Sequence, residues 1–144
     1  MATERSATAT WRGDLMSGEG TIDAAPSGAF GPLDVTWASR AEEPNGRTSP
    51  EELIAAAHSA CFAMALSHGL AQSGTPAEEL RTSATVTFVP GTGITAVALA
   101  VEGRVPGIDE DGFRAAAEAA KDGCPVSQAL AAVPEITLDA RLAG

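Results

Sequence analysis

Two cysteines, Cys61 and Cys124, are the residues of this chain whose type and placement could do chemistry. Cys61 lies inside an apolar run that predicts a helix, whereas Cys124 precedes Pro125 at the start of a second predicted helix. In a reducing compartment a cysteine pair is typically catalytic, redox-sensing or metal-binding, because a lasting structural disulfide is disfavoured there. If the two side chains meet in the fold, the sequence predicts a thiol enzyme.

The local settings of the two thiols predict different reactivity. At a helix start, free N–H groups and the positive end of the dipole would stabilise a Cys124 thiolate. Cys61 is placed in mid-helix, where burial alone raises a thiol pKa and leaves it inert. A nucleophilic Cys61 therefore needs a cation from elsewhere, and arginine suits because it stays charged when buried. The simpler interpretations are a small core residue at Cys61 and a capping residue at Cys124.

Several side chains near Cys61 could complete such a site. Arg40 and Arg47 flank a polar loop, and Glu51 lies in the first turn of the helix that carries Cys61. Because a helix rises about 1.5 Å per residue, Glu51 and Cys61 should lie roughly 15 Å apart. A carboxylate, arginine and thiolate set using Glu51 therefore needs a second chain or a sharp bend, which favours a dimer with interfacial sites. His58, one turn before Cys61, could act as a base or be a packed, hydrogen-bonded histidine.

Length and charge limit the function classes. A chain of 144 residues fits one domain, 1–144, with a single core. Its net charge of −10 opposes nucleic acid or an anionic membrane as a partner. The N-terminus has no apolar segment like that of a secretory signal, and the longest apolar stretch, 53–66, is interrupted by His58 and Ser59 and looks too short to span a bilayer. We therefore expect a cytoplasmic protein. Zinc bound by two cysteines and two histidines is an alternative, although finger-like spacing is lacking.

Periodicity predicts an α+β fold with a largely antiparallel sheet and one central buried helix. That helix starts at a clear signal, with Ser49 as N-cap, Pro50 at the first position and Glu52 completing a capping box. The predicted strands are 7–15, 21–24, 33–37, 82–89, 94–105 and 135–142, and the predicted helices are 50–72, 108–121 and a short one after Cys124.

Two strings around the cysteines resemble the OsmC/Ohr family of thiol-dependent peroxidases. They run from Ser49 to Ser67, including Ala-Cys-Phe, and from Gly123 to Leu130, beginning Gly-Cys-Pro-Val-Ser. The strings 105–109 and 135–139, with the early Trp-x-Gly-Asp at 11–14, are closer to the OsmC branch. The resemblance covers nearly the whole chain and implies an intertwined homodimer, in which strands of both chains wrap two central helices and the sites lie at the interface.

The resemblance also implies roles for named residues. Cys61 corresponds to the cysteine that attacks the peroxide, and Cys124 to the one that resolves the product. Glu51 corresponds to the glutamate that holds an activating arginine, which maps to Arg40 at the end of the strand before the polar loop. Because that loop is about one residue longer than usual, Arg47 remains a second choice.

The implied reaction uses no cofactor and no metal. A Cys61 sulfenic acid forms on attack of an organic hydroperoxide, or of hydrogen peroxide, and condenses with Cys124 to an intramolecular disulfide. An external dithiol then reduces the disulfide by exchange. The alternative function is a non-catalytic module of the same fold, either a redox sensor or a carrier of apolar ligands.

Overall fold

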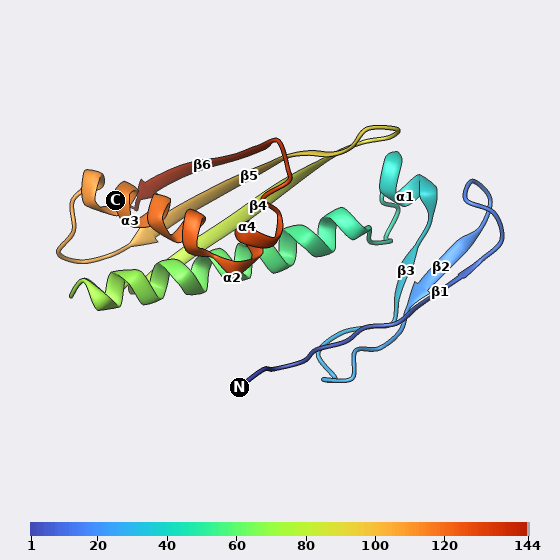
Figure 1. Ribbon diagram of the computed structural model, residues 1–144, viewed down its shortest axis with the longest axis horizontal. Coiled ribbons are helices and arrows are strands. Elements are labelled where there is room, and N and C mark those ends of the chain that lie inside the picture. The colour runs from blue at the N-terminus through green and yellow to red at the C-terminus, as the bar shows by residue number, and fades with distance from the viewer. Residues whose placement is uncertain (144) are drawn as a thin grey trace. The chain divides into compact units, whose positions relative to one another are not determined.

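The computed structural model describes residues 1–143 and divides the chain into two compact units, Met1–Leu53 and Ile54 onward. The described part of the chain contains four helices and six strands, and the strands form two three-stranded sheets. This arrangement confirms the predicted α+β class. Each unit has one of the sheets (Figure 1).

The first unit holds an antiparallel sheet of order β1-β2-β3. Its strands are β1 (Ala9–Arg12), β2 (Glu19–Ile22) and β3 (Leu33–Val35). The predicted hairpin is confirmed, although β1 is shorter than expected and β2 begins earlier. Trp11 pairs with Gly20 across the hairpin, and a Cβ added to Gly20 would lie 2.6 Å from the Trp11 ring. The indole therefore occupies space that any larger residue at this position would need.

The sequence prediction missed helix α1 (Trp37–Ala41), because it extended the preceding strand to Trp37. The helix begins after Thr36, whose hydroxyl accepts a 3.0 Å hydrogen bond from the Ser39 backbone N–H. The Thr36 N–H in turn donates to the Ser39 hydroxyl at 2.9 Å, so a serine completes the capping box where glutamate or glutamine is usual. With α1 added, the element order has two consecutive helices in place of the one predicted.

Helix α2 (Pro50–Gln72) has the start and end that the sequence predicts. The Ser49 hydroxyl accepts a 3.1 Å hydrogen bond from the Glu52 N–H, as an N-cap should. The Glu52 carboxylate accepts from the Thr48 hydroxyl at 2.7 Å, a different partner from the Ser49 N–H of the predicted box. The argument that the apolar stretch is too short for a bilayer was wrong, because α2 is long and apolar enough by those criteria alone. Core helices of soluble proteins also meet them.

The second unit holds a sheet of order β4-β5-β6, built from β4 (Glu79–Val89), β5 (Gly93–Arg104) and β6 (Glu135–Leu142). β4 and β5 are antiparallel, whereas β6 runs parallel to β5. The parallel pairing follows from the long connection through α3 (Glu110–Gly123) and α4 (Pro125–Ala129), which returns the chain to the end where β5 began. Three of the four described strand pairings are antiparallel, as predicted.

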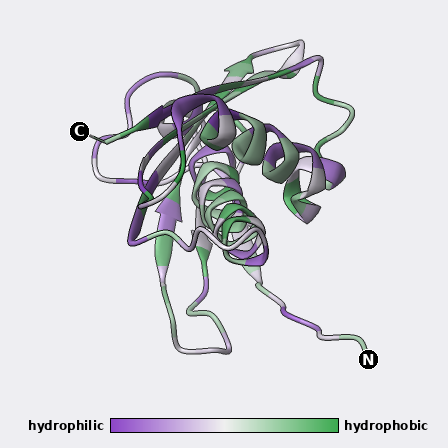
Figure 2. Cartoon of the chain, turned by 90° about the vertical axis from the view of Figure 1, so that its left-hand side faces the viewer, coloured by the Kyte–Doolittle hydropathy of each residue, from purple (hydrophilic) through white to green (hydrophobic). Residues whose placement is uncertain are grey.

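One face of this sheet packs against α2 and α3 to form the core of the second unit. Helix α2 contributes Phe62, Leu66 and Leu70, which are spaced four residues apart and so form one buried stripe. On α3, Phe113 packs over β5 so closely that a Cβ on Gly103 would lie 2.6 Å from its ring. Away from the stripe, the Met64 side chain is 73% exposed. Figure 2, which looks roughly along α2, shows that many residues of this helix are hydrophobic.

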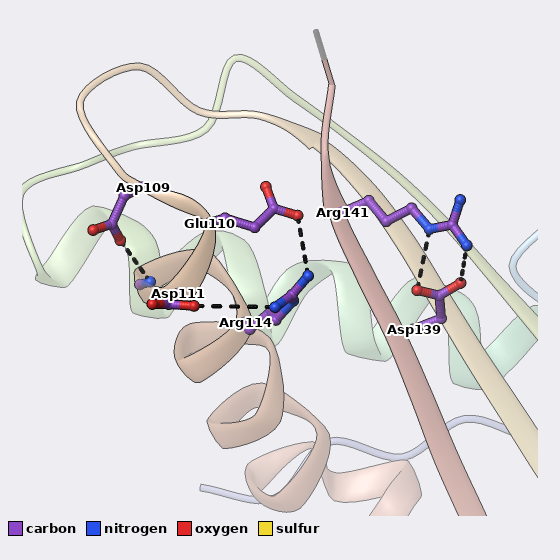
Figure 3. Close-up of polar contacts among 7 residues, drawn as sticks. Asp109, Glu110, Asp111, Arg114, Asp139 and Arg141 are labelled. Atoms are coloured by element: carbon purple, nitrogen blue, oxygen red, sulfur yellow. Dashed lines mark hydrogen bonds and ion pairs between the residues drawn. The ribbon is translucent and has the colours of Figure 1, made fainter.

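Polar contacts fix the start of α3 (Figure 3). The Asp109 carboxylate caps the helix by accepting a 2.7 Å hydrogen bond from a first-turn N–H, an interaction worth about 1 kcal/mol. Arg114 and Glu110 lie 3.7 Å apart one turn later, and Arg141 and Asp139 pair at 3.0 Å on β6. These pairs are exposed and add little stability. The cap sets where α3 begins, and the helix ends at Gly123, beside the second cysteine.

Candidate functional site

The two cysteines meet in the second unit. Cys61 lies on α2 and Cys124 at the junction of α3 and α4, and their Sγ atoms are 2.9 Å apart as free thiols. A disulfide bond measures about 2.05 Å, so the two sulfurs are in contact without being bonded. A small movement of either side chain would allow the bond to form.

The junction of two helices places Cys124 against α2. Its N–H donates to the Ala120 carbonyl at 2.9 Å and so closes α3, while its own carbonyl accepts from Gln128 at 3.0 Å and opens α4. Pro125 occupies the first turn of α4, as predicted. Cys124 is 0% exposed, whereas Cys61 is only partly buried. A peroxide or an external thiol approaching this unit therefore reaches Cys61 first.

The pKa values of the two thiols move in opposite directions. Burial raises the pKa of Cys61, and its hydrogen bond with Cys124 raises it further. Burial also acts to raise the pKa of Cys124, but hydrogen bonds from the Cys61 thiol and from Ser127 and Val126 outweigh it and lower the pKa. The result agrees with the expectation from the helix start that Cys124 is the more acidic thiol. Cys61 needs a cation to become a thiolate at neutral pH.

A second contact between α2 and α4 lies beside the sulfurs. His58 Nε2 and Ser127 Oγ are 2.7 Å apart, and both side chains are buried, with His58 0% and Ser127 7% exposed. His58 precedes Cys61 by three residues, and Ser127 follows Cys124 by three, so each pair shares one face of its helix. Sequence reasoning considered His58 but missed Ser127. The equal spacing in the two helices was the signal that could have found it.

Arg40 and Glu51 form an ion pair in the first unit. The guanidinium binds the carboxylate through two parallel contacts, Nε to Oε1 at 3.0 Å and Nη2 to Oε2 at 2.9 Å, and Glu51 is 6% exposed. The Ser39 hydroxyl donates to the Thr48 carbonyl at 3.0 Å, which ties α1 to the residues before α2. The prediction that Arg40 lies at the end of a strand was wrong, because the residue belongs to helix α1. Arg47 is exposed on the loop.

Metal ligands do not gather within residues 1–143. No group of three or more histidine, cysteine, aspartate or glutamate side chains there could hold a metal ion. The zinc alternative therefore has no ligand set in the part of the chain that the structure describes.

The buried histidine generates a prediction on stability. Burial lowers the pKa of His58 below its ordinary value of about 6.5, so the unfolded chain binds a proton more readily than the folded one. Above about pH 6.5 the imidazole is neutral in both states and does not affect the free energy of unfolding. As the pH falls below this value, protons bind the unfolded chain first, so the free energy of unfolding should decrease. Urea denaturation between about pH 7.5 and 5.5 should show a flatter dependence for His58→Gln than for the wild type.

The exposed His68 on the same helix supplies the matched control. Replacement of His58 should change the dependence of unfolding free energy on pH more than His68→Gln does. The same slope in the two variants would contradict the assignment of this pH effect to the buried imidazole.

Known proteins resemble this chain over most of its length. The family described as OsmC-like protein matches residues 43–139. Peroxiredoxin OsmC of Escherichia coli strain K12 is 43% identical over 145 aligned residues, which cover 99% of each chain. Two solved structures share the fold. An OsmC-like protein of Mycoplasma pneumoniae has a TM-score of 0.74 at 15% identity and full coverage of both chains. The organic hydroperoxide resistance protein OhrB of Bacillus subtilis has a TM-score of 0.64 at 24% identity, covering 96% of this chain and 98% of its own.

The resemblance noted in the two cysteine strings is thus confirmed by independent matches to the family and to a full-length relative. Both strings are carried on helices that bring the thiols together. On this evidence the chain belongs to the OsmC-like protein family.

Proposed function

We propose that this chain is a thiol-dependent peroxidase that reduces organic hydroperoxides, and also hydrogen peroxide, through Cys61 and Cys124. The observation that carries the proposal is the contact between an accessible thiol and a buried one at 2.9 Å. The relative from E. coli is named a peroxiredoxin, and the B. subtilis structure is named for resistance to organic hydroperoxides.

The proposed cycle has three steps. The Cys61 thiolate attacks one peroxide oxygen, the O–O bond breaks, and an alcohol or water leaves while Cys61 becomes a sulfenic acid. Cys124 then attacks the Cys61 sulfur and displaces water, which forms the disulfide. An external dithiol reduces that disulfide by thiol exchange and restores both thiols. Sulfur supplies and regains the electrons throughout, so the cycle uses no cofactor.

Activation of Cys61 is assigned to Arg40, held by Glu51. Burial raises the pKa of Cys61, so a positive charge must come close to it for the thiolate to form at neutral pH. The two-point contact with Glu51 orients the Arg40 guanidinium. We assign this role to Arg40 and not to the exposed Arg47, which remains the second choice.

The complete site is proposed to form in an intertwined homodimer of single 1–144 domains. The family match crosses the boundary between the two units, which supports one domain.

The outer side of α2 carries exposed Met64 beside exposed alanines, and an apolar surface of this kind usually marks an interface. We propose that a partner chain, and not a membrane, covers this apolar side of α2. The net charge of −10 opposes nucleic acid as a partner. We further propose that the dimer is cytoplasmic.

The first prediction concerns the attacking thiol. Cys61→Ser should abolish thiol-dependent consumption of cumene hydroperoxide, because a serine hydroxyl cannot be oxidised to a sulfenic acid. Cys124→Ser should retain the first turnover and lose the disulfide, as measured by peroxide loss and intact-protein mass. Equal activity in wild type and Cys61→Ser would refute the proposed reaction.

A second prediction separates the two arginines. In the Cys124→Ser background, Arg40→Gln should raise the pKa of the Cys61 thiol by about one to three units, since an opposite charge is lost. Thiolate absorbance followed against pH measures this shift. Arg47→Gln, the same change on the exposed loop, should leave the Cys61 pKa unchanged. If Arg47→Gln shifts it and Arg40→Gln does not, the roles are reversed.

A third prediction concerns assembly. Sedimentation equilibrium at micromolar concentration should give twice the mass of one chain, because the apolar side of α2 would be buried by a partner. Met64→Glu should weaken the dimer, since it places a charge in the interface. A single-chain mass for the wild type would contradict the proposed homodimer.

A further inference from the structure

His58 is a buried titratable side chain that the proposed cycle leaves without a role. It is 0% exposed and lies four residues before Phe62, on the stripe of α2 that packs into the core. Within the described residues its Nδ1 atom is buried without a hydrogen-bond partner. An unpaired polar atom is costly in a core, where an apolar side chain would pack without that penalty. The hydrogen bond at Nε2 is therefore the feature of this histidine that needs an explanation.

That hydrogen bond leads directly to the resolving thiol. Ser127 Oγ lies 2.7 Å from His58 Nε2. Ser127 follows Cys124 by three residues in the first turn of α4, and its hydroxyl contributes to the lowered pKa of the Cys124 thiol. Cys124 Sγ lies 2.9 Å from Cys61 Sγ. Two contacts between α2 and the start of α4 thus lie side by side, one between His58 and Ser127 and one between the two sulfurs.

We propose that His58 and Ser127 form a proton relay for Cys124, in which Ser127 touches the resolving thiol and His58 positions Ser127 and accepts the proton. The inference deepens the proposed function and rests on its disulfide step. Ser127 is the group in contact with a reacting atom, whereas His58 acts through it.

The relay balances without any added reagent. As Cys124 attacks, its thiol proton passes to Ser127 Oγ while the Ser127 proton passes to His58 Nε2. The S–S bond forms, the S–O bond of the Cys61 sulfenic acid breaks, and the leaving hydroxide takes up a proton as water. The imidazolium then releases its proton and returns to the neutral form. Overall, a thiol and a sulfenic acid become a disulfide and water.

The surroundings of His58 suit a neutral proton acceptor. The Cys61 and Cys124 thiols are the titratable groups at this contact between α2 and α4, and burial alone accounts for the lowered pKa of His58. From β4, Thr82 binds the Ser59 carbonyl at 2.9 Å, next to His58 in the chain. The side chains of β5 and α3 that are buried in the core, Val97, Leu99, Val101 and Phe113 among them, are apolar. His58 therefore stays unprotonated near neutral pH. The relay uses the tautomer with its proton on Nδ1, in which Nε2 accepts from the Ser127 hydroxyl.

A single-turnover experiment tests the relay. Reduced protein is mixed with one equivalent of cumene hydroperoxide, dimedone is added at timed intervals, and mass spectrometry separates the Cys61 sulfenic adduct from the disulfide. In the wild type the disulfide should form with little adduct. In His58→Gln and in Ser127→Ala, sulfenic acid formation should keep its rate while disulfide formation slows about tenfold or more near neutral pH. The adduct should accumulate as a result.

The choice of variants separates proton transfer from simple positioning. His58→Gln can still hydrogen-bond to Ser127 but does not accept a proton, so its defect should shrink as the pH rises and solvent deprotonates Cys124. His68→Gln on the exposed side of α2 should match the wild type. A wild-type rate of disulfide formation in His58→Gln, or a defect equal at every pH, would overturn the relay. If the wild type forms no disulfide, the resolving step of the proposed function fails and the relay fails with it.

Discussion

The rotation of α2 about its own axis is the constraint on which the thiol contact depends. Burial of Phe62, Leu66 and Leu70 against the second sheet fixes that rotation, because residues four apart share one face of a helix. His58 continues the stripe by one turn and is buried for that reason. Cys61 immediately precedes Phe62 in the sequence and so lies off the buried stripe, where it remains partly exposed. The accessibility of this thiol is thus a consequence of core packing.

The fold was predictable wherever local pattern decides structure. The alternation along β4 and β6, and the Ser49 cap of α2, produce elements whose positions agree closely with those expected. Helix α1 was not predictable by the same means, because five residues are too few to show a helical period and Ser39 replaces the usual capping-box residue. The parallel pairing of β6 depends on where α3 and α4 return the chain, and periodicity carries no information on that path.

The site was predictable in its chemical groups and much less so in its connections. The two cysteine strings were sufficient to name Cys61 and Cys124, and Glu51 could be placed in the first turn of α2. The pairing of His58 with Ser127 requires the angle between α2 and α4, which follows from packing and not from either segment alone. The position of Arg40 on a short helix depends on hydrogen bonds between segments, such as that from Ser39 to Thr48.

The hydrogen bonds around Cys124 would serve both halves of the proposed cycle. In the oxidised protein, a reducing thiolate attacks the more accessible sulfur, and the better leaving group is the thiol of lower pKa. Both conditions select attack at Cys61 with departure of Cys124, since Cys124 is buried and hydrogen bonds from Ser127 and Val126 lower its pKa. The groups that favour the Cys124 thiolate as attacker therefore also favour it as leaving group. A buried, acidic thiol beside an accessible one is consequently an arrangement that would give each half of the proposed cycle a defined direction.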